Sequence, residues 1–463
     1  MADATRAGPD PLAVALGNAS LLGVGYLMLG RRLLAFCAGV VTILLVSVLV
    51  SVARSWCEFV VFLWWVAVIA HGWFLAGGRD HRVTVGGQRL VAFGALVPVV
   101  LVVGLLRFDA ARIERSVTEA RESGDCARLV TAQRRVWLGH RIADAPMTAR
   151  GDEPVRACGR LQTAKARLTT GLTGDTGELK AGFDILAAVL AAPGNDRTVE
   201  VVLNGFLSSV PAQEPCQIAA ITDWLRQRPS PGPPDRSADT VTRTAPAALV
   251  GCGDHLMSTN AWQTARTRYQ QLLDQYPGDE HAVAARNGVK QATLTIELEN
   301  VRGLLEGSTD TRPAYCSTPA KYSGAAPYGK GTNRALFYGN GKYTGKLPAE
   351  WRTTDVTHAV LVVCAGEQDY GSSVQSCHYE NKLLPRFPRK VTFHKIAIPV
   401  KVYELRTGRL VADRKVAIGG KSCPRVLRYT TSSFLTDIGP RPDAYVVPSQ
   451  NDVRAGFRSL INR

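Results

Sequence analysis

The 463-residue chain lacks a complete catalytic or nucleotide-binding motif. A phosphate loop requires GxxxxGK[ST] between a strand and a helix. The segment 324–331 ends in glycine instead of a hydroxyl residue, and 415–422 begins with lysine instead of glycine. The spacing of Gly339, Gly341 and Gly345 does not fit a dinucleotide loop, and no GxSxG elbow occurs. These absences argue against nucleotide chemistry and serine-hydrolase chemistry.

Metal-binding spacing is also missing among the ten cysteines. No CxxC pair occurs, and the closest approach to a mixed pair is Cys377 beside His378. Adjacent side chains rarely chelate one ion together, whereas zinc sites use separated ligands. The sequence therefore predicts no metal and no other cofactor.

Charged residues are absent from three long apolar runs before Arg107. A helix rises about 1.5 Å per residue, so roughly 20 apolar residues cross a hydrocarbon core about 30 Å thick. Membrane-spanning helices are therefore predicted at 33–53, 59–77 and 90–106. The segment 12–30 is diluted by Asn18, Ser20 and glycines. It is predicted as a fourth span, with a shallow interfacial helix as the alternative.

Acidic residues and lysine do not occur within any predicted span. The only candidates for a polar path through the membrane are Asn18 and His71. An ionisable group in a span suggests function by default. Because His71 has no charged neighbour in the spans, we expect it to bond a neighbouring helix instead of serving a transporter.

The short loops between the predicted spans differ in arginine content. Arginines concentrate in the first and third loops, at Arg31, Arg32, Arg79, Arg82 and Arg89, whereas the second loop has Arg54 alone. Loops rich in Arg and Lys remain cytoplasmic. This bias predicts that the chain after about residue 110 lies outside the cell.

Eight cysteines follow the predicted membrane region, and exported domains commonly pair cysteines as disulfides. They are Cys126, Cys158, Cys216, Cys252, Cys316, Cys364, Cys377 and Cys423. Proximity in the chain predicts Cys126 with Cys158, Cys216 with Cys252, and Cys364 with either Cys377 or Cys423. Cys316 takes the cysteine that remains.

The segment 109–304 has apolar residues at helical spacing, interrupted by a proline-rich stretch at 228–247 that is predicted as a loop. Its clearest unit is 246–277, with Gly253, Ala265, Tyr269 and Pro277. This unit resembles a tetratricopeptide repeat, in which a small residue and an alanine let two antiparallel helices pack closely. The resemblance implies a short helical solenoid; an unrelated helical bundle is the alternative.

Glycine, serine, proline and threonine dominate 305–335, which is predicted as a linker. Valine, isoleucine and tyrosine are then frequent at 356–364, 391–405 and 409–418, with a hairpin turn at Thr407-Gly408. We therefore expect an antiparallel β domain over 336–463, closed by a helix at 451–462. The whole is a membrane helical bundle over 1–108 followed by an exported α+β region.

Two further resemblances concern the ends of the chain. The order of Trp351, Cys364, Cys377 with Tyr379, and Cys423-Pro424 is similar to an uncharacterised module of bacterial surface proteins. The opening segment resembles small bacterial membrane modules with a glycine-rich helix hairpin. With the arginine- and alanine-rich composition, this suggests an uncharacterised actinobacterial envelope protein and implies no activity.

The net charge of +16 favours anionic neighbours. A candidate anion-binding patch comprises Lys382, Arg386, Arg389, Lys390 and Lys395; the alternative is a strand edge protected by charge. His358, His378 and His394 lie in the same domain with the acidic residues Glu367, Asp369 and Glu380. Their convergence in one pocket would favour an enzyme.

The sequence is thus best interpreted as an integral membrane protein of the cell envelope without catalytic activity. Its partners are the lipid bilayer and a protein, a peptide or an anionic envelope polymer. Nucleic acid is not expected outside the membrane. The alternatives are an envelope-acting enzyme with a site in the β domain, and a transporter component.

This topology predicts the accessibility of Cys126 and Cys423 in intact cells. A membrane-impermeant maleimide should label both after reduction, because reduction frees thiols that are paired outside the membrane. Labelling is measured by mass spectrometry with and without reductant. Labelling that requires broken cells would contradict the predicted side of the membrane.

Overall fold

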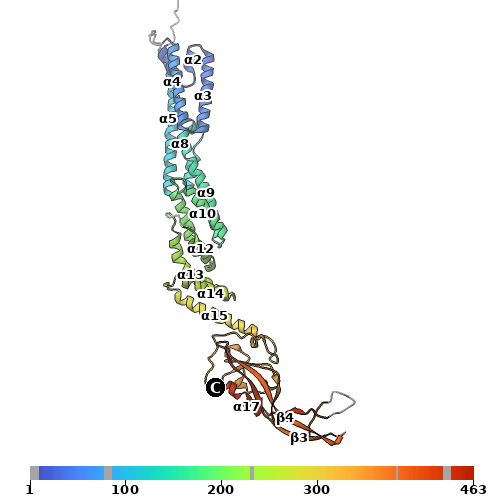
Figure 1. Ribbon diagram of the computed structural model, residues 1–463. Helices are drawn as coiled ribbons and strands as arrows, with labels where there is room; N and C mark the ends of the chain where they lie inside the picture. Colours follow the sequence, from blue (N-terminus) through green and yellow to red (C-terminus); the bar gives the residue numbers. More distant parts are fainter. Residues whose placement is uncertain (1–9, 78–85, 230–233, 382–383, 431–438) are drawn as a thin grey trace, which may run out of the picture. The chain divides into compact units, whose positions relative to one another are not determined.

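The computed structural model describes residues 10–77, 86–229, 234–381, 384–430 and 439–463; the side chains of 381–386 are outside this description. The chain divides into two compact units, Met1–Ala248 and Leu249–Arg463. The first unit is helical, and the second joins helices to a mixed sheet (Figure 1).

Three helices of the first unit are long and apolar enough to cross a membrane: α3 (Arg32–Val52), α4 (Ser55–Leu75) and α5 (Gly86–Ser123). Most of their apolar side chains are not buried within the protein, as expected for helices that contact the hydrocarbon of a membrane. They cover nearly all of the three runs predicted as spans; α3 ends one residue and α4 two residues before the predicted bounds. Ala53 follows α3 with a positive φ of 50°, which stops the helix before α4 begins.

The prediction of a fourth membrane-spanning helix at 12–30 is wrong, because this segment is not a single helix. Residues 12–30 instead form two short helices, α1 (Pro11–Ala19) and α2 (Val24–Met28). The chain turns between them through positive φ angles at Leu21 and Gly23, which a continuous helix does not allow. The two helices pack so closely that a Cβ at Gly25 would overlap the carbonyl of Val14. This segment is a helical hairpin.

Helix α5 runs on for 38 residues, well beyond the predicted end of its span at residue 106. Its second half buries Ile113, Val117 and Ala120 against neighbouring helices. These neighbours include α6 (Cys126–Gln133) and α9 (Asp152–Gly171), which are joined by the predicted Cys126–Cys158 disulfide.

Short helices complete the first unit around α9. They are α7 (Leu138–Ala143), α8 (Ala145–Arg150), α10 (Thr176–Leu190), α11 (Asp196–Ser209), η1 (Val210–Ala212) and α12 (Pro215–Gln227). The predicted loop at 228–247 is shorter than expected, because α13 (Ser237–Ser258) begins within it. The Asp235 carboxylate accepts a hydrogen bond from Ser237 N at 2.9 Å and so starts this helix.

Two helices of the second unit, α14 (Trp262–Gln275) and α15 (Ala282–Leu304), pack as a pair after the end of α13. Tyr269 on α14 is buried between Gly253 and Gly288, and a Cβ at either glycine would lie 2.6 Å from the tyrosine Cζ. Asn260 makes the turn before α14 with a φ of 62°. The expected unit at 246–277 covers the end of α13 and α14 and does not coincide with the α14–α15 pair. The resemblance to a tetratricopeptide repeat stays a prediction.

The sheet of the second unit has six strands in the order β1-β2-β4-β3, with β5 and β6 also paired to β4. Their bounds are β1 (Ala335–Tyr338), β2 (Leu361–Ala365), β3 (Asp369–Asn381), β4 (Leu384–Glu404), β5 (Leu410–Ile418) and β6 (Asp443–Tyr445). The expectation of an antiparallel sheet is wrong, because β1 pairs with β2 and β6 with β4 in parallel. The predicted hairpin turn at Thr407-Gly408 joins β4 to β5.

Both faces of the sheet are covered around β1, β2 and the adjoining part of β4. One face packs on α17 (Gln450–Ile461), whose Val453, Phe457 and Leu460 are buried as predicted. The other face packs on α15 and on Tyr315 of the short helix η2 (Ala314–Cys316). Because β1 and β2 are buried on both sides, they are short continuous apolar runs without alternation.

Residues 305–335 are not an extended linker between domains. Tyr315 and Ala325 are buried against the sheet, and Tyr322 N donates to Leu405 O at 2.8 Å. Glu297 of α15 accepts hydrogen bonds from Ser323 N at 2.7 Å and pairs with Lys321 at 3.1 Å. Burial of these few apolar side chains outweighs the polar composition on which the prediction rested.

The disulfides of the second unit correct the predicted pairing of Cys364. Cys364 bonds Cys316, and Cys377 bonds Cys423. In β2 the side chains alternate between faces, and Cys364 points to the face that η2 covers. Cys377 lies farther along β3, across from Val391. Cys216 and Cys252 are also disulfide-bonded.

The contact around Tyr269 predicts opposite effects for two glycine-to-alanine substitutions. Gly253→Ala should destabilise the protein by about 1–3 kcal/mol, because the added methyl overlaps a buried ring. Gly159→Ala in α9, where nothing lies within 4 Å of the added Cβ, should stabilise it by about 0.5–1 kcal/mol. Thermal unfolding of the full-length protein in detergent measures both. Equal thermal-unfolding midpoints for the two variants would contradict the close contact between Gly253 and Tyr269.

The Glu297 contacts predict a dependence of stability on pH. Burial raises the pKa of Glu297, but the hydrogen bonds from Ser323 and the charge of Lys321 outweigh this and hold the pKa below 4.5. A lowered carboxylate pKa stabilises the fold above that ordinary value, and the stabilisation disappears as the pH falls through the folded-state pKa.

Glu297→Gln should therefore lower stability at pH 7 by about 1 kcal/mol or less, since Lys321 is exposed. Its unfolding midpoint should also fall less steeply than that of the wild type below pH 4.5. Melting curves from pH 7 to acidic pH test this. Parallel curves for the two proteins would show that Glu297 carries no such linkage.

Candidate functional site

Three histidines of the β domain, His358, His378 and His394, do not converge. His358 pairs with Asp355 of its own turn at 3.0 Å, and His378 lies across from Lys390 on the β3–β4 hairpin. Asp369 pairs with Lys415 at 3.2 Å. Glu367 and Glu380 are exposed. Among the described residues no group of three His, Cys, Asp or Glu side chains could hold a metal ion.

His394 is the one histidine of the three with a tightly built environment. Its Nε2 lies 2.7 Å from an Asp443 carboxylate oxygen, and its Nδ1 lies 3.1 Å from Gly371 O. Ser373 is its cross-strand neighbour. Because both ring nitrogens already face acceptors, neither is placed to take a proton from Ser373. The pair Asp443–His394 ties β6 to β4 and does not form a hydrolase triad.

The five residues of the predicted anion patch do not form one surface. Lys382 and the side chain of Arg386 lie outside the described residues. Arg389 and Lys390 are exposed, but neighbouring residues of a strand point to opposite faces. Lys395 lies five residues beyond Lys390, which is roughly 17 Å along the strand. The patch is better described as a basic β3–β4 arm.

A disulfide brings further arginines to this arm. Cys377 on β3 bonds Cys423, and the Tyr379 hydroxyl donates to Pro424 O at 2.9 Å. The segment after Cys423 carries Arg425 and Arg428, both exposed. Sequence reasoning missed these two residues, because only the correct disulfide pairing places their segment on the arm.

A polar pocket of about 520 Å³ opens beside β1. Its lining is Thr309, Asp310, Arg334, Phe337, Gly341, Thr344, Gly345, Ala349, Arg352, Thr353 and Thr354. The volume lies within the roughly 300–1,000 Å³ usual for small-molecule sites. The pocket draws on the predicted linker, on β1 and on the turns that follow β1.

Backbone contacts hold the pocket walls in place. Gly339 N donates to Thr309 O at 2.8 Å, which ties the 305–335 segment to the end of β1. Thr353 N donates to Ala335 O at 3.0 Å, and Arg334 Nη2 donates to Arg352 O at 3.2 Å. The two arginines are therefore neighbours, although 18 residues separate them in the chain.

The charge of this pocket is predominantly positive. Two guanidinium groups face one carboxylate, that of Asp310. The side chain of Arg352 has no ion pair or hydrogen bond to any residue that the structure describes. Guanidinium forks and threonine hydroxyls bind carboxylate or phosphate oxygens. Neither spacing nor periodicity signalled this site, because its residues come from three separate segments.

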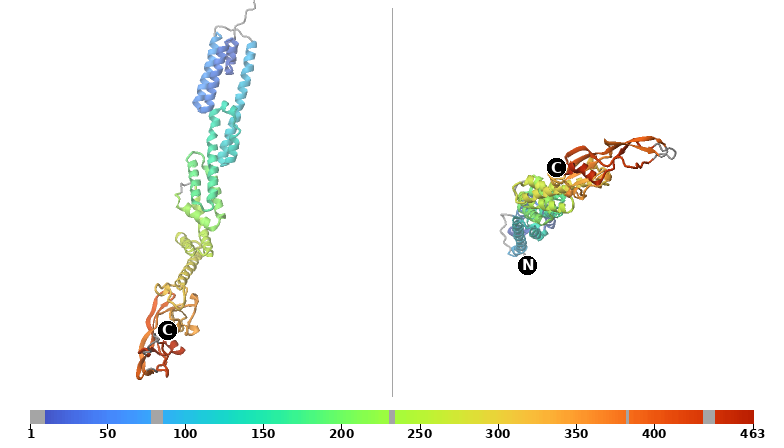
Figure 2. Two further views of the ribbon diagram at one scale, coloured as in Figure 1. Left: turned by 90° about the vertical axis from the view of Figure 1, so that its right-hand side faces the viewer. Right: turned by 90° about the horizontal axis from the view of Figure 1, so that it is seen from below.

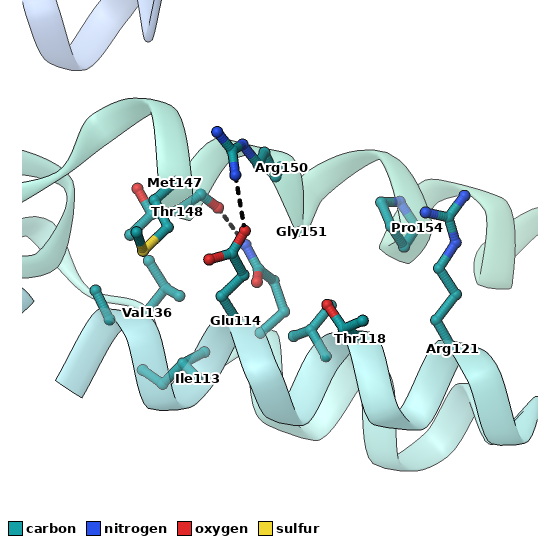
Figure 3. A pocket seen from close by; sticks show the side chains of 13 residues that line it. Ile113, Glu114, Thr118, Arg121, Val136, Met147, Thr148, Arg150, Gly151 and Pro154 are labelled. Carbon is teal, nitrogen blue, oxygen red and sulfur yellow. Dashed lines mark hydrogen bonds and ion pairs between the residues drawn. The ribbon is translucent and has the colours of Figure 1, made fainter. Parts of the chain in front are cut away.

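A second, smaller pocket of about 160 Å³ lies in the first unit between α5 and the α8–α9 corner (Figure 3). Figure 3 shows Glu114 reaching across to Arg150, and the ion pair measures 3.1 Å. Gln133 Nε2 donates to Thr148 O and to Asp152, both at 2.9 Å. The crevice is smaller than a typical ligand site, and Glu114, Arg150 and Gln133 are already engaged in contacts within the protein. We interpret it as structural.

Polar side chains also meet among the apolar helices. Asn18 is fully buried; its Nδ2 donates to Val68 O at 3.2 Å, and its Oδ1 accepts from Tyr26 N. The Tyr26 hydroxyl lies 2.8 Å from His71 Nδ1. His71 thus bonds a neighbouring helix, as predicted. These bonds attach the α1–α2 hairpin to α4 and do not form a continuous path.

No protein-family model matches the chain, and neither a curated protein nor a solved structure matches it. The chemistry of the polar pocket and of the arm is therefore the basis for assigning a function.

Proposed function

We propose that the protein is a non-catalytic, membrane-anchored binding protein of the cell envelope. In this proposal α3, α4 and α5 cross the membrane, the chain after about residue 110 lies outside, and the second unit binds an anionic ligand. The ligand is a segment of an anionic envelope polymer, or an acidic peptide with the same carboxylate or phosphate chemistry. The observation that carries the proposal is the polar pocket with Arg334 and Arg352.

The distribution of cysteines supports the topology. All the disulfide-bonded cysteines follow the apolar stretch of α5, whereas the free cysteines Cys37 and Cys57 lie in α3 and α4. Disulfides persist in oxidising compartments outside the cytoplasm. The arginine-rich first and third loops favour the same orientation. The two arguments are independent, since one concerns redox chemistry and the other concerns insertion.

The arrangement of donors supports an oxyanion as the ligand. Arg352 has no partner among the described side chains, and Arg334 uses one donor on a backbone carbonyl. Both therefore retain N–H groups that an oxyanion can accept. Thr309 and Thr354 add hydroxyl groups to the lining. An uncharged ligand would leave the pocket with two positive charges and the single negative charge of Asp310.

The basic arm supports a ligand that extends beyond the pocket. Arg389, Lys390 and Lys395 are exposed and have no acidic partner among the residues that the structure describes. Arg389 and Lys395 are six residues apart and so lie on the same face of the strand. A polymer with repeated anionic groups that follows this face gains a contact at each, and salt screens these contacts. A single small anion would occupy the pocket alone and would be insensitive to the arm.

We predict that Arg352→Gln weakens binding of a poly(glycerol phosphate) probe by tenfold or more. The loss of a charge-assisted hydrogen bond costs about 1.5–3 kcal/mol, and about 1.4 kcal/mol corresponds to tenfold in affinity. Binding is measured by calorimetry with the full-length protein in detergent, at low and at high salt. A polyglutamate probe distinguishes phosphate from carboxylate ligands.

The matched control is Lys390→Gln, which removes the same charge from the arm and should weaken binding only slightly. Arg352→Lys keeps the charge but loses the planar fork, so its affinity should lie between wild type and Arg352→Gln. Wild-type affinity in Arg352→Gln would reject the pocket. Equal losses in Arg352→Gln and Lys390→Gln would indicate non-specific attraction by charge.

A further inference from the structure

An apolar groove of about 500 Å³ lies between the long helices of the first unit. The α1–α2 hairpin packs on both α4 and α5, and the groove begins at Leu21 in the hairpin turn. Figure 2, left, shows α5 standing apart from the α3–α4 pair beyond the hairpin. The walls come from three helices: Val46 and Leu49 of α3, Val61 and Phe62 of α4, and Val100 and Val103 of α5.

The length of the groove corresponds to one leaflet of a bilayer. Along α5 its lining runs from Val99 to Arg107, which is about 12 Å at 1.5 Å per residue. Along α4 it runs from Glu58 to Trp65, or about 10 Å. Half of a hydrocarbon core is about 15 Å thick. The groove therefore has the dimensions of an acyl chain from one leaflet.

Charged groups occur only at the end of the groove that is away from the hairpin. There Arg107 Nε donates to Ala143 O at 2.7 Å, and Arg107 Nη2 lies 3.4 Å from Glu58. The Arg107 side chain is 54% exposed, and these two contacts use only part of its donors. An arginine at this depth reaches the headgroup region, where lipid phosphates lie.

We propose that this groove binds one phospholipid molecule, with an acyl chain between α3, α4 and α5 and its phosphate against Arg107. The inference rests on the membrane location in the proposed function, but not on ligand binding by the second unit. Apolar walls of leaflet length match the acyl chain, and the Arg107 donors that Glu58 and Ala143 leave free match the phosphate. The bound chain fills the space between α5 and the α3–α4 pair that the short α1–α2 hairpin leaves open.

The test uses the full-length protein in nanodiscs that contain a phospholipid with a photoreactive diazirine in its acyl chain. After irradiation, mass spectrometry locates the adducts. We expect adducts to concentrate on Val61, Val100 and Val103 in the groove. Leu101 and Val102 are similarly exposed but do not line the groove, and they should react several-fold less.

Two α5 variants make a matched pair. Val100→Trp fills the groove and should abolish the groove adducts and the retention of phospholipid in detergent, which native mass spectrometry measures. Leu101→Trp adds the same ring next to the groove and should retain the lipid. Arg107→Gln should lower retention several-fold, and Arg107→Lys should restore most of it.

Uniform adducts over groove and non-groove residues would overturn the proposal, as would unchanged retention in Val100→Trp. Cross-links between two copies of the chain at the groove would identify a second protomer as the occupant and would also overturn it. Arg352→Gln should retain the lipid fully, so failure of the anion pocket and failure of the lipid site are distinguishable. Fractionation of cells into membrane and soluble material tests the membrane location on which the lipid site depends.

Discussion

The continuity of α5 is the constraint on which the first unit depends. One helix carries an uncharged apolar stretch and then a polar stretch that buries Ile113, Val117 and Ala120 against its neighbours. Apart from the hydrogen bond that Pro98 cannot donate, the interior peptide groups bond within the helix, so the two stretches form one continuous helix of roughly 57 Å. The groove and the Glu58–Arg107 pair lie on its first stretch, and the Glu114–Arg150 crevice lies on its second.

The second unit is organised in a comparable way around β4. This strand pairs with β2, β3, β5 and β6, so it joins the covered part of the sheet to the basic arm. The covered part is rigid, because α17 packs on one face and the 305–335 segment on the other. The polar pocket forms where that segment meets β1. Backbone contacts therefore fix the positions from which the two arginines extend, and Arg334 is held further by its bond to Arg352 O.

The predictions from sequence succeeded where a local pattern decided the structure. A short window of sequence shows the uncharged runs of spanning length and the apolar stripe of α17. It also shows the valine-rich strands near 361–365, 391–404 and 410–418. The failures have physical causes. Positive φ angles at Leu21 and Gly23 divide the first segment, and β3 is a polar arm strand without a clear apolar period. The segment 305–335 is packed through only a few buried side chains.

The sequence by itself determined which helices are apolar enough to meet lipid, where arginine is concentrated, and which cysteines are available for disulfides, because composition and period carry this information. Only the tertiary structure decided that Cys364 pairs with Cys316, that Arg334 and Arg352 share a pocket, and that a groove remains open beside α5. The physical reason is that these features depend on strand order, on the face to which a side chain points and on the spacing of packed helices. Those quantities are set by contacts between residues far apart in the chain.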